Sequence, residues 1–383
     1  MPFASLGLSP ELLRAVVESN FTVPTPVQKE AIPAILAGKD VWACAQTGSG
    51  KTAAFALPLL QNIQKAERDA PLRLHTLILV PTRELAAQVG ESIVHFAGYL
   101  PRPVKVISVF GGVSINPQMM ALRGGADIVV ATPGRLLDLV DHNALRLAQT
   151  AALVLDEADR LLDLGFADEL ASIIERLAWR KQTLLFSATF PPDVRALAEQ
   201  LLRDPIRIDV PAITATEPDI LQRSIHVDPP RRTQLLRHLI NKHGWSRTLV
   251  FVATRYATEH IAVKLRRLGI PATAFSGEMS QGARTKALAD FKAGRVKVLI
   301  ATDVAARGID IAELPAVVNY DLPRSTTDYV HRIGRTGRAG ESGVAVSFVP
   351  SEFENHFRLI EKRQGKRVPR EIIAGFEPSA PQD

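Results

Sequence analysis

Short runs rich in Val, Ile and Leu recur along this chain, each followed by a polar loop and then by a stretch of helical periodicity. Such runs lie at 40–45, 76–81, 104–110, 127–132, 152–157 and 183–188, and again at 248–254, 272–277, 296–302, 316–321 and 343–349. Nearly continuous hydrophobicity over so few residues is typical of strands buried on both faces of a parallel sheet. Their alternation with amphipathic stretches such as 84–96 and 169–179 predicts βαβ architecture.

The chain is long enough for two cores, and its pattern is interrupted once. With 383 residues, two domains are the default expectation. Three prolines and scattered threonines break the periodicity at 204–219. We therefore predict an α/β fold of two tandem domains, each with a largely parallel sheet flanked by helices. The predicted domains are 1–205 and 219–370, joined by a linker at 206–218 and followed by a flexible tail at 371–383.

The charge is unevenly distributed between these domains. The chain contains 46 Lys and Arg against 40 Asp and Glu, a formal net charge of +6. Residues 1–206 hold 19 basic against 21 acidic side chains (−2), and residues 207–383 hold 27 against 19 (+8). A basic half predicts a polyanionic partner, of which nucleic acid is the commonest.

Cysteine usage and hydropathy restrict the compartment. Cys44 is the only cysteine, so no internal disulfide can form, and a reducing compartment is expected. The first residues show no secretory signal, and no apolar stretch approaches the ~20 residues that span a bilayer. We expect a cytoplasmic protein with no membrane partner. The histidines and the cysteine show no zinc-ligand spacing, so Mg²⁺ is the only metal expected.

Clusters of Gly, Thr, Asp and Arg follow directly after the predicted strands, at the sheet edge where ligands bind in α/β folds. The stretch AQTGSGKT at 45–52 fits a P-loop, with Ala45 in the place of the first glycine. Lys51 is expected to reach the β- and γ-phosphates, and Thr52 to offer its hydroxyl to Mg²⁺. The predicted nucleotide-binding residues here are Thr47, Gly48, Ser49, Gly50, Lys51 and Thr52.

A second acidic motif, DEAD at 156–159, ends another apolar run. Asp156 stands where an uncompensated carboxylate would be costly, and a bound Mg²⁺, direct or through water, would remove that cost. Glu157 is placed to orient or deprotonate a water that attacks the γ-phosphate. The alternative is that these acids only cap the following helix.

In its ordered motifs the chain resembles the DEAD-box RNA helicases, superfamily 2 helicases with two RecA-like domains, in a bacterial-type minimal core. The resemblance runs from Phe3 to about Arg370. The motifs are FTVPTPVQ (21–28), AQTGSGKT (45–52), PTRELA (81–86), Gly-Gly (111–112), TPGR (132–135), DEAD (156–159), SAT (187–189), LVFVATR (249–255), QGAR (281–284), ATDVAARGID (301–310) and HRIGRTGR (331–338).

The resemblance implies ATP as the nucleotide. Phe21 resembles the aromatic residue that stacks on adenine, and Gln28 resembles the amide that reads it, although an isolated Phe is usually a core residue. Asp310, with Gly308 beside it, matches the position that holds the ribose. Phe3 resembles the upstream aromatic of the family.

The resemblance also implies a catalytic contribution from the second domain. Arg335 and Arg338 match arginines that face the γ-phosphate across an interdomain cleft and stabilise its charge. Arg332 is left open between that role and a structural one. His331 matches a histidine that contacts the DEAD motif, or is an ordinary histidine whose hydrogen bonds are satisfied within the protein.

Two hydroxyl residues are expected to couple the ATP site to RNA. Ser187 and Thr189 resemble the pair that ties the DEAD carboxylates, including Asp159, to the rest of the site. Considered without the family resemblance, these two residues could instead cap the helix that is expected to begin near Asp193.

Eight residues match positions that the family uses on the RNA backbone: Arg83, Gly112, Thr132, Arg135, Arg255, Arg284, Thr302 and Asp303. Contacts of this kind position a strand without reading its sequence, and they weaken with salt. The five basic residues of 361–370 are either a solvated helix end or a further RNA contact. Two departures from the family pattern are Val-Ala before Thr254 and Ser276 in place of a histidine.

The function implied is that of an ATP-dependent RNA helicase. ATP and single-stranded RNA close the cleft together, the bound strand is bent, a short duplex separates locally, and hydrolysis reopens the cleft. One alternative is an ATP-gated RNA clamp or RNP-remodelling platform that seldom unwinds, which uses the same residues. A translocating DNA helicase is a further alternative. Protein partners in RNA processing or decay are also expected.

Overall fold

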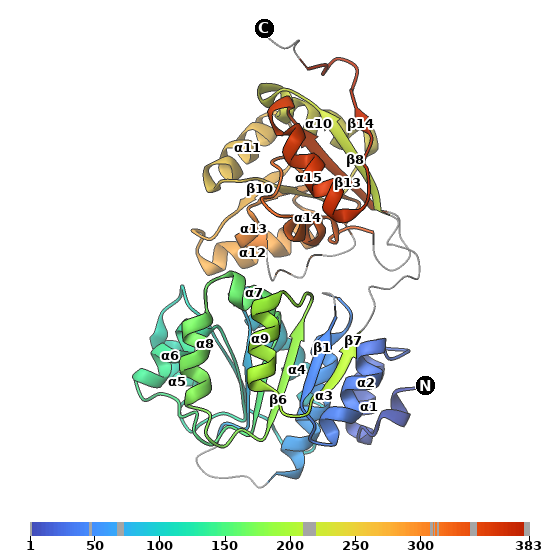
Figure 1. Cartoon of the computed structure of the whole chain (residues 1–383). Coiled ribbons are helices and arrows are strands. Elements are labelled where there is room, and N and C mark those ends of the chain that lie inside the picture. Colours follow the sequence, from blue (N-terminus) through green and yellow to red (C-terminus); the bar gives the residue numbers. More distant parts are fainter. Residues whose placement is uncertain are drawn as a thin grey trace. The chain divides into compact units, whose positions relative to one another are not determined.

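The computed structural model describes residues 2–45, 48–66, 73–209, 220–306, 309, 311, 314–337 and 343–378. The chain divides into two compact units, Met1–Thr214 and Ala215–Asp383. Figure 1 shows the first in blue to green and the second in yellow to red. Each unit is a parallel sheet covered by helices on both faces.

In the first unit the described strands form one parallel sheet in the order β3-β4-β2-β5-β6-β1-β7. The strands are β1 (Val41–Cys44), β2 (Thr76–Leu79), β3 (Val106–Val109), β4 (Ile128–Ala131), β5 (Ala152–Leu155), β6 (Gln182–Ser187) and β7 (Ile206–Asp209). The helices are η1 (Phe3–Leu6), α1 (Pro10–Glu18), α2 (Pro26–Leu36), α3 (Lys51–Lys65), α4 (Arg83–Ala97), α5 (Ile115–Ala121), α6 (Pro133–Asp141), α7 (Ala158–Asp163), α8 (Ala167–Glu175) and α9 (Pro192–Leu201).

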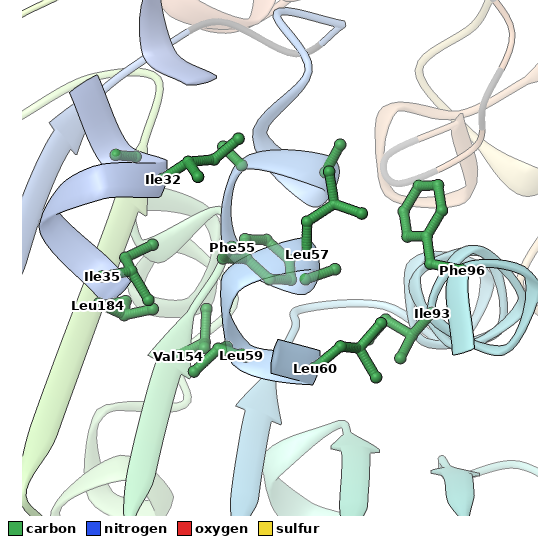
Figure 2. Packing of buried hydrophobic residues seen from close by; sticks show 14 of the residues in the cluster. Ile32, Ile35, Phe55, Leu57, Leu59, Leu60, Ile93, Phe96, Val154 and Leu184 are labelled. Atoms are coloured by element: carbon green, nitrogen blue, oxygen red, sulfur yellow. The ribbon is translucent and has the colours of Figure 1, made fainter. Parts of the chain in front are cut away.

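Alternate residues of the central strands supply two separate cores, because successive side chains of a strand point to opposite faces. Val154 of β5 packs with α2, α3 and α4 on one face. Leu153 and Leu155 pack with α6, α8 and α9 on the other. Figure 2 shows the first core, where Phe55 of α3 lies among side chains of neighbouring helices and strands. Two buried faces explain why these strands read as unbroken apolar runs.

In the second unit the described strands form a parallel sheet in the order β10-β11-β9-β12-β13-β8-β14. The strands are β8 (Ile220–His226), β9 (Thr248–Phe251), β10 (Ala272–Phe275), β11 (Val298–Ala301), β12 (Ala316–Asn319), β13 (Gly343–Val349) and β14 (Arg370–Glu371). The helices are η2 (Pro229–Arg231), α10 (Arg232–His243), α11 (Arg255–Arg267), α12 (Gln281–Lys292), α13 (Asp303–Ala306), α14 (Thr326–Ile333), η3 (Ser351–Phe353) and α15 (Glu354–Gln364).

The second sheet is also buried on both faces. Val250 of β9 packs with α10 and α11, whereas Leu249 and Phe251 pack with α12 and α13. A smaller core joins β13 to α14 and α15 through Tyr329 and Phe357. The predicted fold class, two α/β units with parallel sheets, is confirmed.

Three strands lie where none was predicted. β7 pairs with β1, so the first four residues of the predicted linker belong to the first sheet. β8 lies between β13 and β14. β14 pairs Glu371, the first residue of the predicted tail, with Ile225. The remaining linker residues, 210–218, and residues 379–383 of the tail lie outside the described residues.

Within the described residues, no helix is both long enough and apolar enough to cross a bilayer.

Candidate functional site

The carboxyl ends of β1, β6 and β5 are neighbours at one edge of the first sheet. The P-loop leaves β1 at this edge and enters α3 at Lys51. Gly48 and Gly50 have φ angles of 83° and 86°, a left-handed conformation that favours glycine. A side chain at Gly50 would also collide with the amide of Gln28. The backbone conformation of the loop therefore explains the glycines of the motif. Thr47 lies outside the described residues.

Lys51 carries a buried charge whose donors are unused. Its side chain is 6% exposed, and its Nζ lies 3.9 Å from Oδ1 of Asp156. In the part of the chain that the structure describes, this Nζ makes no hydrogen bond. A buried ammonium group has three donors to satisfy, and phosphate oxygens are the acceptors that a P-loop offers it. This orphaned donor fits a nucleotide phosphate.

Asp156 is even more buried than Lys51. Burial is the largest effect and raises the pKa of Asp156 to about 6, against the opposing charge of Lys51, while Glu157 and Asp159 raise it as well. A divalent cation would favour the ionised form. Thr52, the residue after Lys51, supplies the hydroxyl that the P-loop pattern assigns to such a cation.

A metal ion at this edge would depend on ligands besides protein carboxylates. Among the described residues there is no group of three or more His, Cys, Asp and Glu that could hold a metal. Mg²⁺ commonly takes one or two protein ligands and completes its shell with water and substrate phosphates. Thr52 and Asp156 fit that pattern.

Glu157 is held by a charge that the sequence prediction did not include. Its backbone has φ 52° at the start of α7, an uncommon conformation for a residue with a side chain. Its Oε2 accepts a hydrogen bond from Nη1 of Arg160 at 3.1 Å, and both side chains are almost fully buried. The i,i+3 spacing of Glu and Arg was the available signal for this pair. The turn and the ion pair fix the carboxylate next to Asp156.

The SAT hydroxyls bind the DEAD motif. Oγ1 of Thr189 and its backbone N–H donate to Oδ2 of Asp159, at 2.7 and 3.0 Å. Oγ of Ser187 accepts from the N–H of Asp159 at 3.2 Å and donates to the carbonyl of Thr189 at 2.7 Å. Helix α9 has no side-chain cap, so the alternative capping role is not observed. The ends of β5 and β6 are thereby joined in one network.

Gln28 links α2 to the P-loop. Its Oε1 accepts from the N–H of Thr25 at 2.9 Å, and its Nε2 donates to the carbonyl of Gly50 at 3.1 Å. Oε1 can accept one further hydrogen bond, and Nε2 can donate one more. Phe21 is 37% exposed, with its ring centroid 6.3 Å from that of Phe96. Phe3, by contrast, is buried in the first core.

The candidate RNA residues of the first unit lie at the carboxyl ends of β2, β3 and β4. Arg83 begins α4 and lies against Gly112, where a Cβ would collide with its guanidinium. Nη2 of Arg135 donates to the carbonyl of Val113 at 2.8 Å. Thr132 immediately precedes α6. The structure therefore brings the four predicted residues of this unit to adjacent loops of one sheet edge.

In the second unit, Arg255 and Thr302 also follow strands directly. Arg255 begins α11 after β9, and its Nη1 pairs with Oε1 of Glu278 on the surface. Oγ1 of Thr302 accepts from the N–H of Ala305 at the start of α13, at 3.4 Å. Both residues lie at the edge where ligands bind in α/β folds.

Two other predicted RNA contacts, the buried Arg284 and the half-buried Asp303, bind partners within the second unit. Arg284 is 2% exposed and donates to the carbonyls of Ser276 and Ala305, at 2.7 and 3.4 Å. Its guanidinium lies 4.3 Å from the ring centroid of Phe275. Asp303 accepts two hydrogen bonds from Arg332, at 2.6 and 2.7 Å. These contacts hold both side chains in place within the second unit.

Arg332 is a structural residue. Besides Asp303, its guanidinium donates to Oδ1 of Asn319 at 3.0 Å and to the carbonyl of Asp321 at 2.7 Å. It is 2% exposed and stacks over the ring of Phe251. The structural alternative left open for this arginine is the one observed.

The other residues of HRIGRTGR are described in part. Arg335 is buried, and its Nη1 donates to the carbonyl of Ile309 at 2.9 Å. His331 is half-buried in the last turn of α14. Gly308, Asp310 and Arg338 lie outside the described residues.

Family models match both units. Residues 25–197 match the model described as DEAD/DEAH box helicase. Residues 231–340 match the model described as Helicase conserved C-terminal domain.

Curated relatives share about two fifths of the residues of this chain. The ATP-dependent RNA helicase DeaD of Mycobacterium tuberculosis is 43% identical over 360 residues, which are 94% of this chain and 63% of that protein. The DeaD protein of Escherichia coli K12 is 42% identical over 375 residues, which are 98% of this chain and 59% of that protein. The DEAD-box helicase CshA of Bacillus cereus is 39% identical, covering 96% of this chain and 69% of that protein. The chain thus spans about three fifths of the length of the DeaD relatives.

Solved structures share the fold of both units. Dbp5 of S. cerevisiae, bound to RNA and ADP BeF3, matches with a TM-score of 0.84 and 32% identity, over 97% of this chain and 95% of that one. A DEAD box protein of Methanococcus jannaschii matches with a TM-score of 0.55 and 37% identity, over 97% and 99% of the two chains.

Proposed function

The chain belongs to the DEAD-box family of helicases, and from this premise we propose that it is an ATP-dependent RNA helicase. It binds single-stranded RNA with both units and separates short duplexes locally as it hydrolyses ATP. The observation that carries the proposal is the buried Nζ of Lys51, which lies beside Asp156 and makes no hydrogen bond with the described residues. The DEAD motif that contains Asp156 is in turn hydrogen-bonded to Thr189, just after β6. A buried cation and a buried acid of raised pKa together suit a magnesium nucleotide.

The first unit binds the nucleotide. Lys51 donates to the β- and γ-phosphate oxygens, and the amide N–H groups of the P-loop surround them. Phe21 stacks on the adenine and Gln28 reads its edge, while Gly308 and Asp310 of the second unit hold the ribose. Thr52 and Asp156 would hold Mg²⁺, directly or through water, and the ion would neutralise charge on the phosphate oxygens.

Glu157 acts on the attacking water. Its carboxylate orients the water and accepts its proton. The ion pair with Arg160 and the left-handed turn hold that carboxylate in place. Because both partners are buried, removing the charge of either leaves the other uncompensated.

Arginines of the second unit complete the reaction. Arg335 and Arg338 stabilise the charge of the transferring phosphoryl group. In the present structure Nη1 of Arg335 donates to the carbonyl of Ile309. The binding of ATP together with RNA brings Arg335 and Arg338 to the phosphoryl group, and the release of products reverses this change. His331 of the second unit takes part in this coupling.

RNA is bound through its sugar–phosphate backbone. Arg83, the Gly112 loop, Thr132 and Arg135 serve the first unit, and Arg255 and Thr302 serve the second. Arg284 and Asp303 belong to the same proposed set in the second unit. Dbp5 of S. cerevisiae, which shares the fold, is bound to RNA in its solved structure, and this supports RNA as the ligand. Contacts of this type bring little sequence specificity and a steep salt dependence.

The test is steady-state ATP hydrolysis by the whole chain. Rates are compared without nucleic acid, with single-stranded RNA and with single-stranded DNA of equal length. Glu157→Gln serves as the blank, because it keeps the shape of the site and loses the carboxylate. We expect RNA, but not DNA, to stimulate hydrolysis by the wild type. The Glu157→Gln variant should bind ATP but hydrolyse it at least about 100-fold more slowly.

A strand-separation assay on a short RNA duplex follows. Separation that requires ATP supports the helicase function. RNA-stimulated hydrolysis without separation, with long residence on RNA, favours the clamp. Equal stimulation by DNA, or near wild-type turnover by Glu157→Gln, contradicts the proposal.

A further inference from the structure

The loop between β3 and α5, residues 110–114, is held by a side chain that no motif includes. Gln118 of α5 accepts a hydrogen bond from the N–H of Phe110 at 3.0 Å. Its Nε2 donates to the carbonyls of Phe110 and Ser114, at 3.2 and 3.3 Å. One amide therefore ties together the two ends of the loop.

The middle of the same loop is bound by arginines from two other helices. Nη2 of Arg135 donates to the carbonyl of Val113. Arg83 lies against Gly112, whose φ of 77° only glycine adopts readily. Side chains of α4, α5 and α6 thus converge on five residues of backbone.

Donors remain unused at this place. Nη1 of Arg135 is buried and makes no hydrogen bond with the described residues, and its buried Nε also makes none, although it lies 3.5 Å from Oδ2 of Asp138 in an ion pair. The N–H groups of Gly111 and Gly112 are absent from the hydrogen bonds found among these residues. The buried guanidinium donors of Arg135 are costly to leave without an acceptor, whereas the N–H groups of the half-buried Gly111 and the exposed Gly112 are accessible to a ligand. A phosphate oxygen can accept from several such donors at once.

We propose that Gln118 is a positioning residue for RNA: it fixes the 110–114 loop so that these amide and guanidinium donors face one backbone phosphate. The proposal rests on the proposed function, because it refines the RNA site of the first unit. Two adjacent glycines leave an unrestrained loop many conformations, and ordering them on binding would weaken affinity. Gln118 orders them beforehand.

The experiment measures RNA-stimulated ATP hydrolysis as a function of RNA concentration. Gln118→Leu fills the same space without hydrogen bonds. Gln118→Glu keeps the acceptor for Phe110 but directs a carboxylate at two carbonyl oxygens. Both variants should raise the KM for RNA about tenfold, since they remove two to three hydrogen bonds. The rate at saturating RNA and the KM for ATP without RNA should change less than twofold.

Gln64→Leu is the matched control. Gln64 is half-buried on α3 of the same unit and also donates to a backbone carbonyl, that of Arg102, at 2.9 Å. This variant should leave the KM for RNA unchanged. Melting temperatures of all variants are recorded, and a Gln118→Leu variant that fails to fold is replaced by Gln118→Glu.

The outcomes separate the two proposals. A raised KM for RNA in the Gln118 variants alone supports the positioning role. An unchanged KM overturns it, and so does a loss of the RNA-independent ATPase in step with melting temperature, which indicates a merely structural residue. A wild-type chain whose hydrolysis RNA does not stimulate contradicts the proposed function itself.

Discussion

The ammonium group of Lys51 lies 3.9 Å from the carboxylate of Asp156, where both side chains are almost fully buried. The distance is too long for a hydrogen bond, so each charge offsets the other without satisfying its donors or acceptors. A magnesium nucleotide supplies what both groups lack. The site is therefore prepared for binding at a cost in stability that the ligand relieves.

The pH dependence of nucleotide binding follows from Asp156. Its pKa of about 6 lies above the usual 3.8, so its contribution to stability is present at acidic pH and is lost as pH rises through about 6. Binding of Mg²⁺ requires the ionised form. We expect the Kd for magnesium ATP to rise as pH falls below about 6, by up to tenfold per unit.

Calorimetry in buffers of different ionisation enthalpy measures this proton linkage. Binding should release about half a proton near pH 6, approach one proton near pH 5 and release none at pH 8. Proton release that does not vary across this range would contradict the assignment of Asp156.

Thr189 should couple ATP turnover to RNA. Thr189→Val keeps the shape of the side chain and removes the 2.7 Å hydrogen bond to Asp159. We expect little change in ATP affinity and a loss of RNA stimulation on the order of tenfold, because the DEAD motif loses one tie to β6. Thr189→Ser keeps the hydroxyl and should retain stimulation. Equal stimulation in the Val and Ser variants would argue against coupling through this bond.

Substitution of Arg335 should lower the rate of catalysis, whereas substitution of Arg332 should lower stability. Arg335→Lys should spare ATP affinity and lower kcat at least about 100-fold, because an ammonium lacks the planar fork that stabilises a phosphoryl group. Arg332→Lys breaks a buried network with Asp303 and should lower stability by about 2 kcal/mol or more. Denaturant melts and kinetics well below the melting temperature separate the two effects. A wild-type rate in Arg335→Lys would remove its catalytic role.

Arg370 should anchor the carboxyl-terminal strand of the second unit. Its guanidinium pairs with Glu354 and Glu361 of α15 at 2.9–3.0 Å, with about a fifth of the side chain exposed. Arg370→Ala should destabilise this unit by about 3 kcal/mol, since Glu354 and Glu361 both lose the arginine that they share. Arg358→Ala, which removes a largely exposed partner of Glu354, should cost less than about 1 kcal/mol.

This network also has a pH signature. Hydrogen bonds from Arg370, the largest effect, lower the pKa of Glu354 from 4.5 to about 2. Its stabilisation is present above pH 4.5 and is lost as pH falls toward 2. The difference in unfolding free energy between the wild type and Glu354→Gln should therefore shrink over that range, as acid unfolding followed by circular dichroism would measure. A difference that does not change between pH 5 and pH 2 would exclude this network as its source.

The sequence by itself determined the architecture and most of the chemistry of the site. Period, length and polarity identify buried parallel strands because two covered faces demand apolar residues at every position. The P-loop glycines and Lys51 are readable because their conformations and charges are properties of the residues themselves. The sequence likewise placed Asp156 and Glu157 at a strand end, where such acids have few structural reasons to be.

Tertiary structure decided the rest, because partners far apart in the chain leave no local signal. β7 and β14 are short edge strands whose identity comes only from pairing with β1 and β8. Asp303 and Arg332 both lie in motifs, and in the sequence each side chain suits a ligand as well as it suits a partner within the protein. Only the fold shows that the two side chains hydrogen-bond to each other. Gln118 stood in no motif at all. A side chain's role depends on which donors and acceptors the fold brings within about 3 Å of it.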